Sequence, residues 1–237
     1  NGADLEQIIG ADGKIVHPLV DKNVKVSYVV TETETGKEKK TADIDYVVKG
    51  INEQSANKNT KPTVIPEIQE WHSNSTEKIS INSLKTVIYT DDKLKAVVDE
   101  FVRDYKDFTG INLTVKKGAS QANAFNFELK APDTLLGDEG YTMDIQKDRI
   151  NVASVHTTGN MYGMQTILQM YKEDNEGYKI GKMRDYPRFK TRGFLFDVAR
   201  KPVSLDMMKD VARTMRYYKM NDLQTHLSDN YIFLEQY

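Results

Sequence analysis

The sequence contains no cysteine, a single tryptophan among 237 residues, and no apolar run as long as a membrane-spanning helix. Without cysteine there is no disulfide, thiolate metal site or cysteine nucleophile. A spanning helix needs about 20 consecutive apolar residues, so we expect no membrane span in this segment. Lys and Arg number 33 against 35 Asp and Glu, a net charge of -2 that gives no reason to expect a nucleic-acid partner.

Several functional patterns are also missing. We find no Gly-rich phosphate loop, no zinc-ligand spacing and no Ser/His/Asp constellation, so we expect neither a cofactor nor a metal. The chain opens with Asn1-Gly2-Ala3-Asp4, without an initiator Met or a basic-then-apolar leader. We therefore expect an internal piece of a longer protein. Its composition, 39% hydrophobic and 29% charged, is that of a globular protein with one large domain or two smaller ones.

Residues 1–50 predict a β-rich, sandwich-like segment. Residues 24–31 and 42–48 alternate apolar and polar side chains and are rich in β-branched residues, and a turn at Gly36 separates them. Such a hairpin is marginal alone, so it should lie against a neighbouring part of the chain. Residues 51–74 have the composition of a linker, stiffened by Pro62 and Pro66.

Residues 75–186 predict an α+β domain with two helices on one side of a sheet. One helix should follow a cap at Asp91-Asp92 and end at Gly110, and the other should cover residues 159–171. Strands are expected at residues 85–89, 112–116, 124–129, 141–145 and 149–153. Trp71 lies at the start of this domain, and we interpret it as a packing residue rather than a sugar-stacking platform.

Residues 187–237 predict one βαβ unit. An apolar strand at 192–199 is followed by a helix capped by Ser204 and by a second strand at 222–228. This spacing favours a parallel sheet. Since only one unit is complete, we do not expect that sheet to be finished within these residues.

Four ordered sequence blocks carry a family resemblance. They are G-D-E-G-Y-T-M-D-I at 137–145, G-N-M-Y-G-M-Q-T at 159–166, the run from D-Y-P-R-F to R-G-x3-D-x2-R at 185–200, and Y-K-M-N-D-L-Q-T-H-L-S-D-N at 218–230. Together they resemble glycoside hydrolase family 20, of the β-N-acetylhexosaminidase or lacto-N-biosidase type. The first two blocks look like the α+β domain that precedes the catalytic barrel, and the last two like the first two barrel strands. The expected fold class is α+β, ending in the start of a (β/α)8 TIM barrel truncated after its second strand.

The resemblance also implies site residues, because functional groups of such barrels lie at the carboxyl ends of the strands. Arg200, His226 and Asp229 would bind substrate, and the fixed donors of the Arg200 guanidinium suit neighbouring sugar hydroxyls. Arg192 and Asp197 would be structural residues near the site, with Asp197 as a buried partner for an arginine. A histidine such as His226 is, in most proteins, a satisfied core residue, so that interpretation stays open beside the binding one.

The chemistry implied by the resemblance is substrate-assisted retaining hydrolysis, in which an Asp-Glu pair at the end of barrel strand four does the work. The sequence does not reach that pair, so we expect no catalytic residue in this chain and no activity from it alone. Its partners would be N-acetylhexosamine-containing glycans and the remainder of the barrel, and its location secreted or on a bacterial cell surface. The alternative is a non-catalytic carbohydrate-binding or adhesion module of a cell-surface protein.

Overall fold

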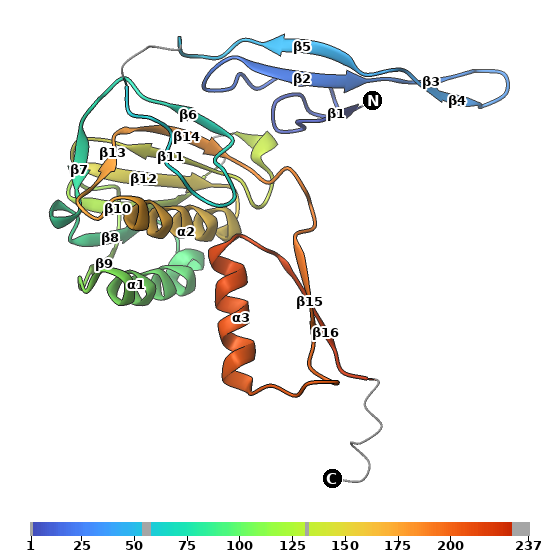
Figure 1. Ribbon diagram of the computed structural model, residues 1–237. Helices are drawn as coiled ribbons and strands as arrows, with labels where there is room; N and C mark the ends of the chain where they lie inside the picture. The colour runs from blue at the N-terminus through green and yellow to red at the C-terminus, as the bar shows by residue number, and fades with distance from the viewer. Residues whose placement is uncertain (1, 54–57, 131–132, 229–237) are drawn as a thin grey trace, which may run out of the picture. The chain divides into compact units, whose positions relative to one another are not determined.

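The computed structural model describes residues 2–53, 58–130 and 133–228, and these carry three α-helices and sixteen strands. The fold class is α+β, as the sequence predicts. The chain divides into two compact units, Asn1–Arg188 and Phe189–Tyr237, and each is described by itself (Figure 1).

The first unit begins with short antiparallel strands. β2 (Lys22–Ser27) lies between β1 (Gly2–Ala3) and β5 (Ile44–Val48), and β3 (Val29–Thr31) pairs with β4 (Glu38–Lys40). The turn between β3 and β4 contains Gly36, whose positive φ of 67° favours glycine. This confirms the expected β structure of the first 50 residues.

These N-terminal strands pack on the rest of the unit. One face of β2 and β5 forms a hydrophobic cluster that also takes residues from far along the chain, and its buried members are Leu5, Ile8, Val24, Val26, Val48, Leu136 and Tyr186. The first 50 residues therefore share a core with the α+β domain.

The centre of the first unit is a seven-stranded mixed sheet in the order β6-β14-β11-β12-β10-β8-β9. β9, β8, β10 and β12 run parallel to one another, whereas β11 is antiparallel to both β12 and β14, and β6 is antiparallel to β14. The bounds are Glu70–His72 (β6), Thr86–Tyr89 (β8), Thr114–Lys117 (β9), Ala124–Leu129 (β10), Tyr141–Ile145 (β11), Arg149–Ser154 (β12) and Gly181–Asp185 (β14). A separate pair is formed by β7 (Lys78–Ser80) and β13 (Gly177–Lys179), and short 3-10 turns lie at Ile81–Ser83, Asp92–Leu94 and Thr134–Leu136.

The structure differs from the sequence expectation in the segment 51–74. Part of the expected linker is the edge strand β6, which pairs with β14. The indole of Trp71 in this strand donates a hydrogen bond to the carbonyl of Asn59, 2.9 Å away. Three residues between polar neighbours are too short to show the alternation from which strands are recognised, so sequence reasoning missed this strand.

Two helices cover one face of the large sheet. α1 (Lys95–Thr109) follows a turn in which Asp91 accepts a hydrogen bond from the Lys93 amide, and it ends at Gly110 with φ 74°. Phe101 of α1 meets the rings of Phe125 and Phe127 of β10 edge-to-face, at 5.5 and 5.4 Å between centroids. The capped helix and its terminating glycine are confirmed.

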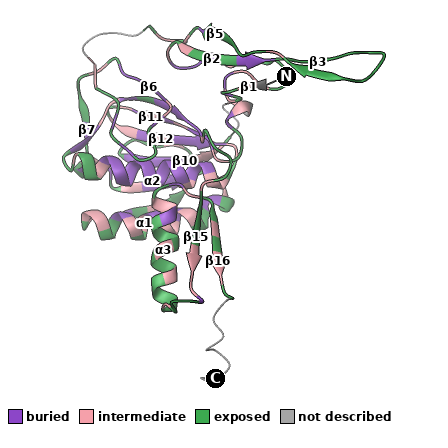
Figure 2. Cartoon of the chain, turned by 45° about the vertical axis from the view of Figure 1, so that its right-hand side comes forward, coloured by how far each residue is buried: buried purple, intermediate pink, exposed green. Residues whose placement is uncertain are grey.

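The second helix, α2 (Thr157–Glu173), lies so close to the sheet that only glycine fits at two positions. A Cβ at Gly159 would lie 2.3 Å from the carbonyl oxygen of Gly140, and one at Gly163 would lie 2.6 Å from Cγ1 of Val152. The glycines of the block at 159–166 are therefore explained by this close approach. Eleven of the seventeen residues of α2 are buried, and Figure 2 shows this helix mostly in the colour of buried residues.

The second unit is a single βαβ element. β15 (Gly193–Asp197) and β16 (Asp222–His226) are parallel, and α3 (Leu205–Tyr217) connects them. The hydroxyl of Ser204 caps α3 by accepting a hydrogen bond from the Met207 amide at 3.1 Å. The predicted strand-helix-strand order is confirmed. Across the described residues, no helix is both long and apolar enough to cross a membrane.

Candidate functional site

Three of the residues expected at the site meet at the carboxyl ends of β15 and β16. Asp197 and His226 are register partners in the two parallel strands, so their side chains lie on the same face. The backbone then turns sharply, and the amides of Val198 and Ala199 both donate to the carbonyl of His226, at 3.1 and 3.2 Å. This turn brings Arg200 back to Asp197.

Asp197 and Arg200 form an ion pair. Nε of Arg200 donates to Oδ2 of Asp197 at 2.5 Å, and the Arg200 amide donates to Oδ1 at 3.1 Å. The backbone hydrogen bond from Arg200, followed by the bond from its side chain, lowers the pKa of Asp197 below its ordinary value. The Asp197 side chain is 22% exposed and that of Arg200 is 70% exposed, so the carboxylate anchors a guanidinium that stays open to solvent.

Arg192 lies at the opposite end of β15. Its Nε donates to the carbonyl of Lys219 and its Nη1 to the carbonyl of Phe189, both at 2.7 Å. Its backbone amide donates to the side chain of Asn221 at 2.9 Å. These bonds tie the amino-terminal ends of the two strands together, away from Arg200 and His226.

The other expected residue, Asp229, lies outside the described residues. Within the described ranges, no group of three His, Asp or Glu side chains is placed to hold a metal ion.

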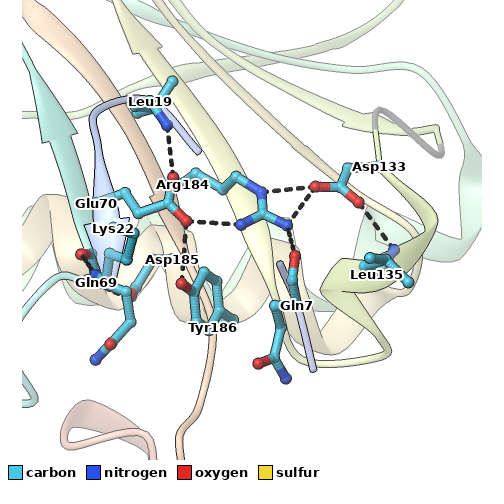
Figure 3. Close-up of polar contacts among 10 residues, drawn as sticks. All are labelled: Gln7, Leu19, Lys22, Gln69, Glu70, Asp133, Leu135, Arg184, Asp185 and Tyr186. Atoms are coloured by element: carbon cyan, nitrogen blue, oxygen red, sulfur yellow. Dashed lines mark hydrogen bonds and ion pairs between the residues drawn. The ribbon is translucent and has the colours of Figure 1, made fainter. Parts of the chain in front are cut away.

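A buried cluster of charged residues in the first unit was not anticipated from the sequence (Figure 3). Arg184 of β14 donates from Nη1 to Oε1 of Glu70 at 2.7 Å and from Nε to Oδ2 of Asp133 at 2.6 Å. It donates a further hydrogen bond to the backbone carbonyl of Gln7. All three charged side chains are at most 7% exposed.

Glu70 joins this cluster to the N-terminal segment. Its Oε2 accepts a hydrogen bond from the Leu19 amide at 2.8 Å, and its Oε1 accepts one from the hydroxyl of Tyr186 at 3.0 Å. Burial and the neighbouring Glu70 carboxylate raise the pKa of Tyr186 well above its ordinary value, so its hydroxyl keeps its proton. With every charge paired, the cluster is a structural joint between residues 1–50 and the sheet, and not a reactive centre.

Asp185, the first residue of the D-Y-P-R-F block, has a structural role in the same region. It accepts hydrogen bonds from the Gln69 amide at 3.1 Å and from the hydroxyl of Tyr141 at 2.9 Å. Residues 185–189 open one of the family blocks, but the two partners of Asp185 lie more than forty residues away in the sequence, Gln69 just before β6 and Tyr141 in β11.

Comparison with known proteins fits the division of the chain into two units after Arg188. Residues 61–186 match the model of glycosyl hydrolase family 20, domain 2, and residues 189–234 match the model of the family 20 catalytic domain. The chain belongs to glycosyl hydrolase family 20. The match to domain 2 begins within the expected linker, before the sheet strand β6.

Curated relatives of this family 20 chain are β-hexosaminidases. It is 30% identical over 141 residues to the β-hexosaminidase subunit beta of Entamoeba histolytica, covering 54% of this chain and 25% of that protein. It is 28% identical over 152 residues to the β-hexosaminidase subunit alpha of Mus musculus, covering 58% of this chain and 29% of that protein. The family 20 chain thus spans less than a third of the length of these relatives.

Solved structures of hexosaminidases match the fold of this chain. The β-N-acetylhexosaminidase of Streptomyces coelicolor matches with a TM-score of 0.62 at 23% identity, over 72% of this chain and 36% of that one. The hexosaminidase of Streptomyces plicatus, solved with Thio-NAglucal, matches with a TM-score of 0.61 at 25% identity, over 73% of this chain and 36% of that one.

Proposed function

We propose that this chain is the N-terminal part of a glycosidase that releases terminal β-linked N-acetylhexosamine from glycans. The observation that carries the proposal is the βαβ unit, in the region matched by the catalytic-domain model, with Arg200, Asp197 and His226 at the carboxyl ends of its strands. In a (β/α)8 barrel this is the face where substrate binds. Further βα units from the longer protein would complete the barrel.

The proposed roles follow the chemistry of each residue. Arg200, with an exposed guanidinium fixed by Asp197, would grip hydroxyls of the terminal sugar. His226 and Asp229 would join it as substrate-binding residues, whereas Asp197 and Arg192 would hold the strand ends in place. The Asp-Glu pair of substrate-assisted retaining hydrolysis would come from the part of the barrel beyond this chain, so the chain alone would be inactive.

The proposed organisation is a β-rich segment at 1–50, a connecting segment at 51–74 whose strand β6 joins the large sheet, an α+β domain at 75–186 and the start of the barrel at 187–237. The enzyme would meet its glycans outside the cell or at its surface.

The test is hydrolysis of 4-nitrophenyl N-acetyl-β-glucosaminide by the longer protein that contains this chain. We expect release of nitrophenol, and we expect Arg200→Ala to lower kcat/KM on the order of 100-fold because a charged donor to the substrate is lost. Arg213→Ala is the matched control, since Arg213 makes an exposed ion pair with Asp210 on α3. Equal effects of the two variants would refute the role of Arg200. Sugar binding without hydrolysis would favour the alternative, a carbohydrate-binding or adhesion module.

A further inference from the structure

The N-terminal strands leave one part of their core-facing side open. Val24 and Val26 of β2 and Val48 of β5 lie on this side and are buried. Tyr46, the register partner of Val24, and Tyr28, two residues beyond Val26, continue the same side but are 43% and 40% exposed. Two aromatic rings thus extend from a closed core into solvent.

These rings border a cavity of about 580 Å³. Its apolar walls are Ile9, Ile15, Val26 and Val48, in addition to the two tyrosines. Cavities that bind small ligands measure roughly 300–1,000 Å³ and combine apolar walls with a few polar groups. The size and the lining of this cavity both meet that description.

The loop that lines one side of the cavity, at residues 9–15, is held by its own hydrogen bonds. The Gly10 amide donates to the carbonyl of Lys14 and the Val16 amide to that of Ile8, both at 2.9 Å. Asp12 accepts a hydrogen bond from the Lys14 amide at 3.0 Å. The cavity is therefore formed by ordered backbone on one side and by β2 and β5 on the other.

Polar residues with hydrogen-bond donors and acceptors also line the cavity, namely Asp12, His17, Lys49, Tyr28 and Tyr46. The Nζ of Lys49 donates to Oδ2 of Asp21 at 2.7 Å, and Asp21 is not a lining residue. Nδ1 of His17 lies 2.8 Å from the carbonyl oxygen of Lys49, which can only accept, so Nδ1 donates this hydrogen bond. The neighbouring Tyr46 hydroxyl raises the pKa of Tyr28 above its ordinary value.

We propose that this cavity is a second carbohydrate site, which binds a sugar ring of an N-acetylhexosamine-containing glycan. A sugar ring has an apolar C–H face that packs on tyrosine and hydroxyls at its edge that need donors and acceptors, and this cavity offers both. A protein partner would be expected to meet few charged groups at the centre of its contact, whereas Asp12 lines this cavity. The choice of sugar rests on the proposed function; the site itself rests on the cavity.

The experiment is titration of the full 237-residue chain with N,N′-diacetylchitobiose, followed by NMR and calorimetry, with maltose as the comparison sugar. We expect saturable binding of the diacetylchitobiose, weakened about tenfold or more by Tyr46→Ala, because the aromatic contact with the sugar ring is lost. Tyr28→Phe should keep most of the affinity, since it keeps the ring. Val30→Ala, which changes an exposed β3 residue outside the cavity lining, is the control and should bind as the parent does.

Three outcomes would overturn the proposal. They are no saturable binding by a folded chain, binding lost in Arg200→Ala but kept in Tyr46→Ala, and a concentration-dependent dimer that Tyr46→Ala dissociates, which would assign the cavity to a second copy. Circular dichroism shows whether each variant is folded. Hydrolysis by the longer protein is measured separately, so failure of the cavity and failure of the proposed activity are distinguishable.

Discussion

The two units of this chain are built from the same kinds of element but bury them differently (Figure 2). In the first unit, eleven of the seventeen residues of α2 are buried. In the second unit, Met215 is the only buried residue among the thirteen of α3, all of which the structure describes. β15 contrasts in the same way with β10, because Phe194 and Leu195 are 43% and 56% exposed whereas Phe125 and Phe127 are fully buried.

This difference shows that helices and strands can form without a buried core around them. The second unit has a capped helix, a parallel strand pair and an apolar strand, all formed by local rules. A parallel strand with a nearly continuous apolar run is typical of a sheet covered on both faces. The exposed apolar residues of β15 and α3 therefore favour our proposal that further barrel elements complete this unit in the longer protein.

The largest expected effect lies in the buried charges of the first unit. Arg184→Met should destabilise it by about 3–5 kcal/mol, because Glu70 and Asp133 would be left as buried carboxylates without their cation. Trp71, the single tryptophan, lies in the neighbouring β6, so urea unfolding followed by its fluorescence reports on this unit.

The matched control for that prediction is Arg149→Met. Arg149 sits on β12 and pairs with the adjacent Asp148 at the surface, so its loss should cost far less. Equal shifts of the two urea midpoints would show that the Arg184 cluster does not hold the N-terminal segment on the sheet.

A pair of leucines tests the difference between the two helices directly. Leu168 of α2 is 1% exposed and Leu205 of α3 is 66% exposed. Leu168→Ala should cost about 2–5 kcal/mol, because it leaves a cavity in the core. Leu205→Ala should change the free energy of unfolding by no more than about 0.5 kcal/mol. Chemical denaturation followed by circular dichroism measures both, and a large cost for Leu205→Ala would mean that α3 is packed within this chain.

A smaller effect is expected where the second unit is stabilised locally. Ser204→Ala should weaken α3 by about 0.5–2 kcal/mol, because the Met207 amide loses its acceptor. The measurement is hydrogen exchange of the amides in the first turn, which should become faster. Ser204→Asp retains an acceptor and should exchange like the parent; if it does not, the cap is not what holds this turn.

The smallest effect concerns pH at the carboxyl ends of β15 and β16. The hydrogen bonds from Arg200 lower the pKa of Asp197 from 3.8. The ionised carboxylate therefore stabilises this turn above that value, and the stabilisation is lost as pH falls through the lower pKa of the folded state. NMR titration of the Asp197 carboxyl should give a midpoint below 3.8, and Arg200→Ala should raise it. An unchanged midpoint in Arg200→Ala would contradict the ion pair.

Much of the fold was predictable because the signals are local. The Asp91 cap, the Gly110 terminus and the Ser204 cap each satisfy backbone groups within a few residues, so they can be recognised in the sequence. The meeting of Asp197 and His226 was also predictable, since parallel strands place their carboxyl ends at one edge. The strand β6 and the partners of Arg184 were not predictable, because they depend on pairing between residues more than fifty positions apart in the sequence.

By itself, the sequence determined the two helices of the α+β domain, the βαβ unit, their caps and the family blocks, since these depend on neighbouring residues. The tertiary structure decided which of them share a core. Glu70, Asp133 and Arg184 are ordinary surface residue types in isolation, and they become a buried joint only because β6 and β14 pair and the N-terminal segment covers them. Burying one of these charges would be costly unless the others were present, and that mutual requirement cannot be read from any single stretch of sequence.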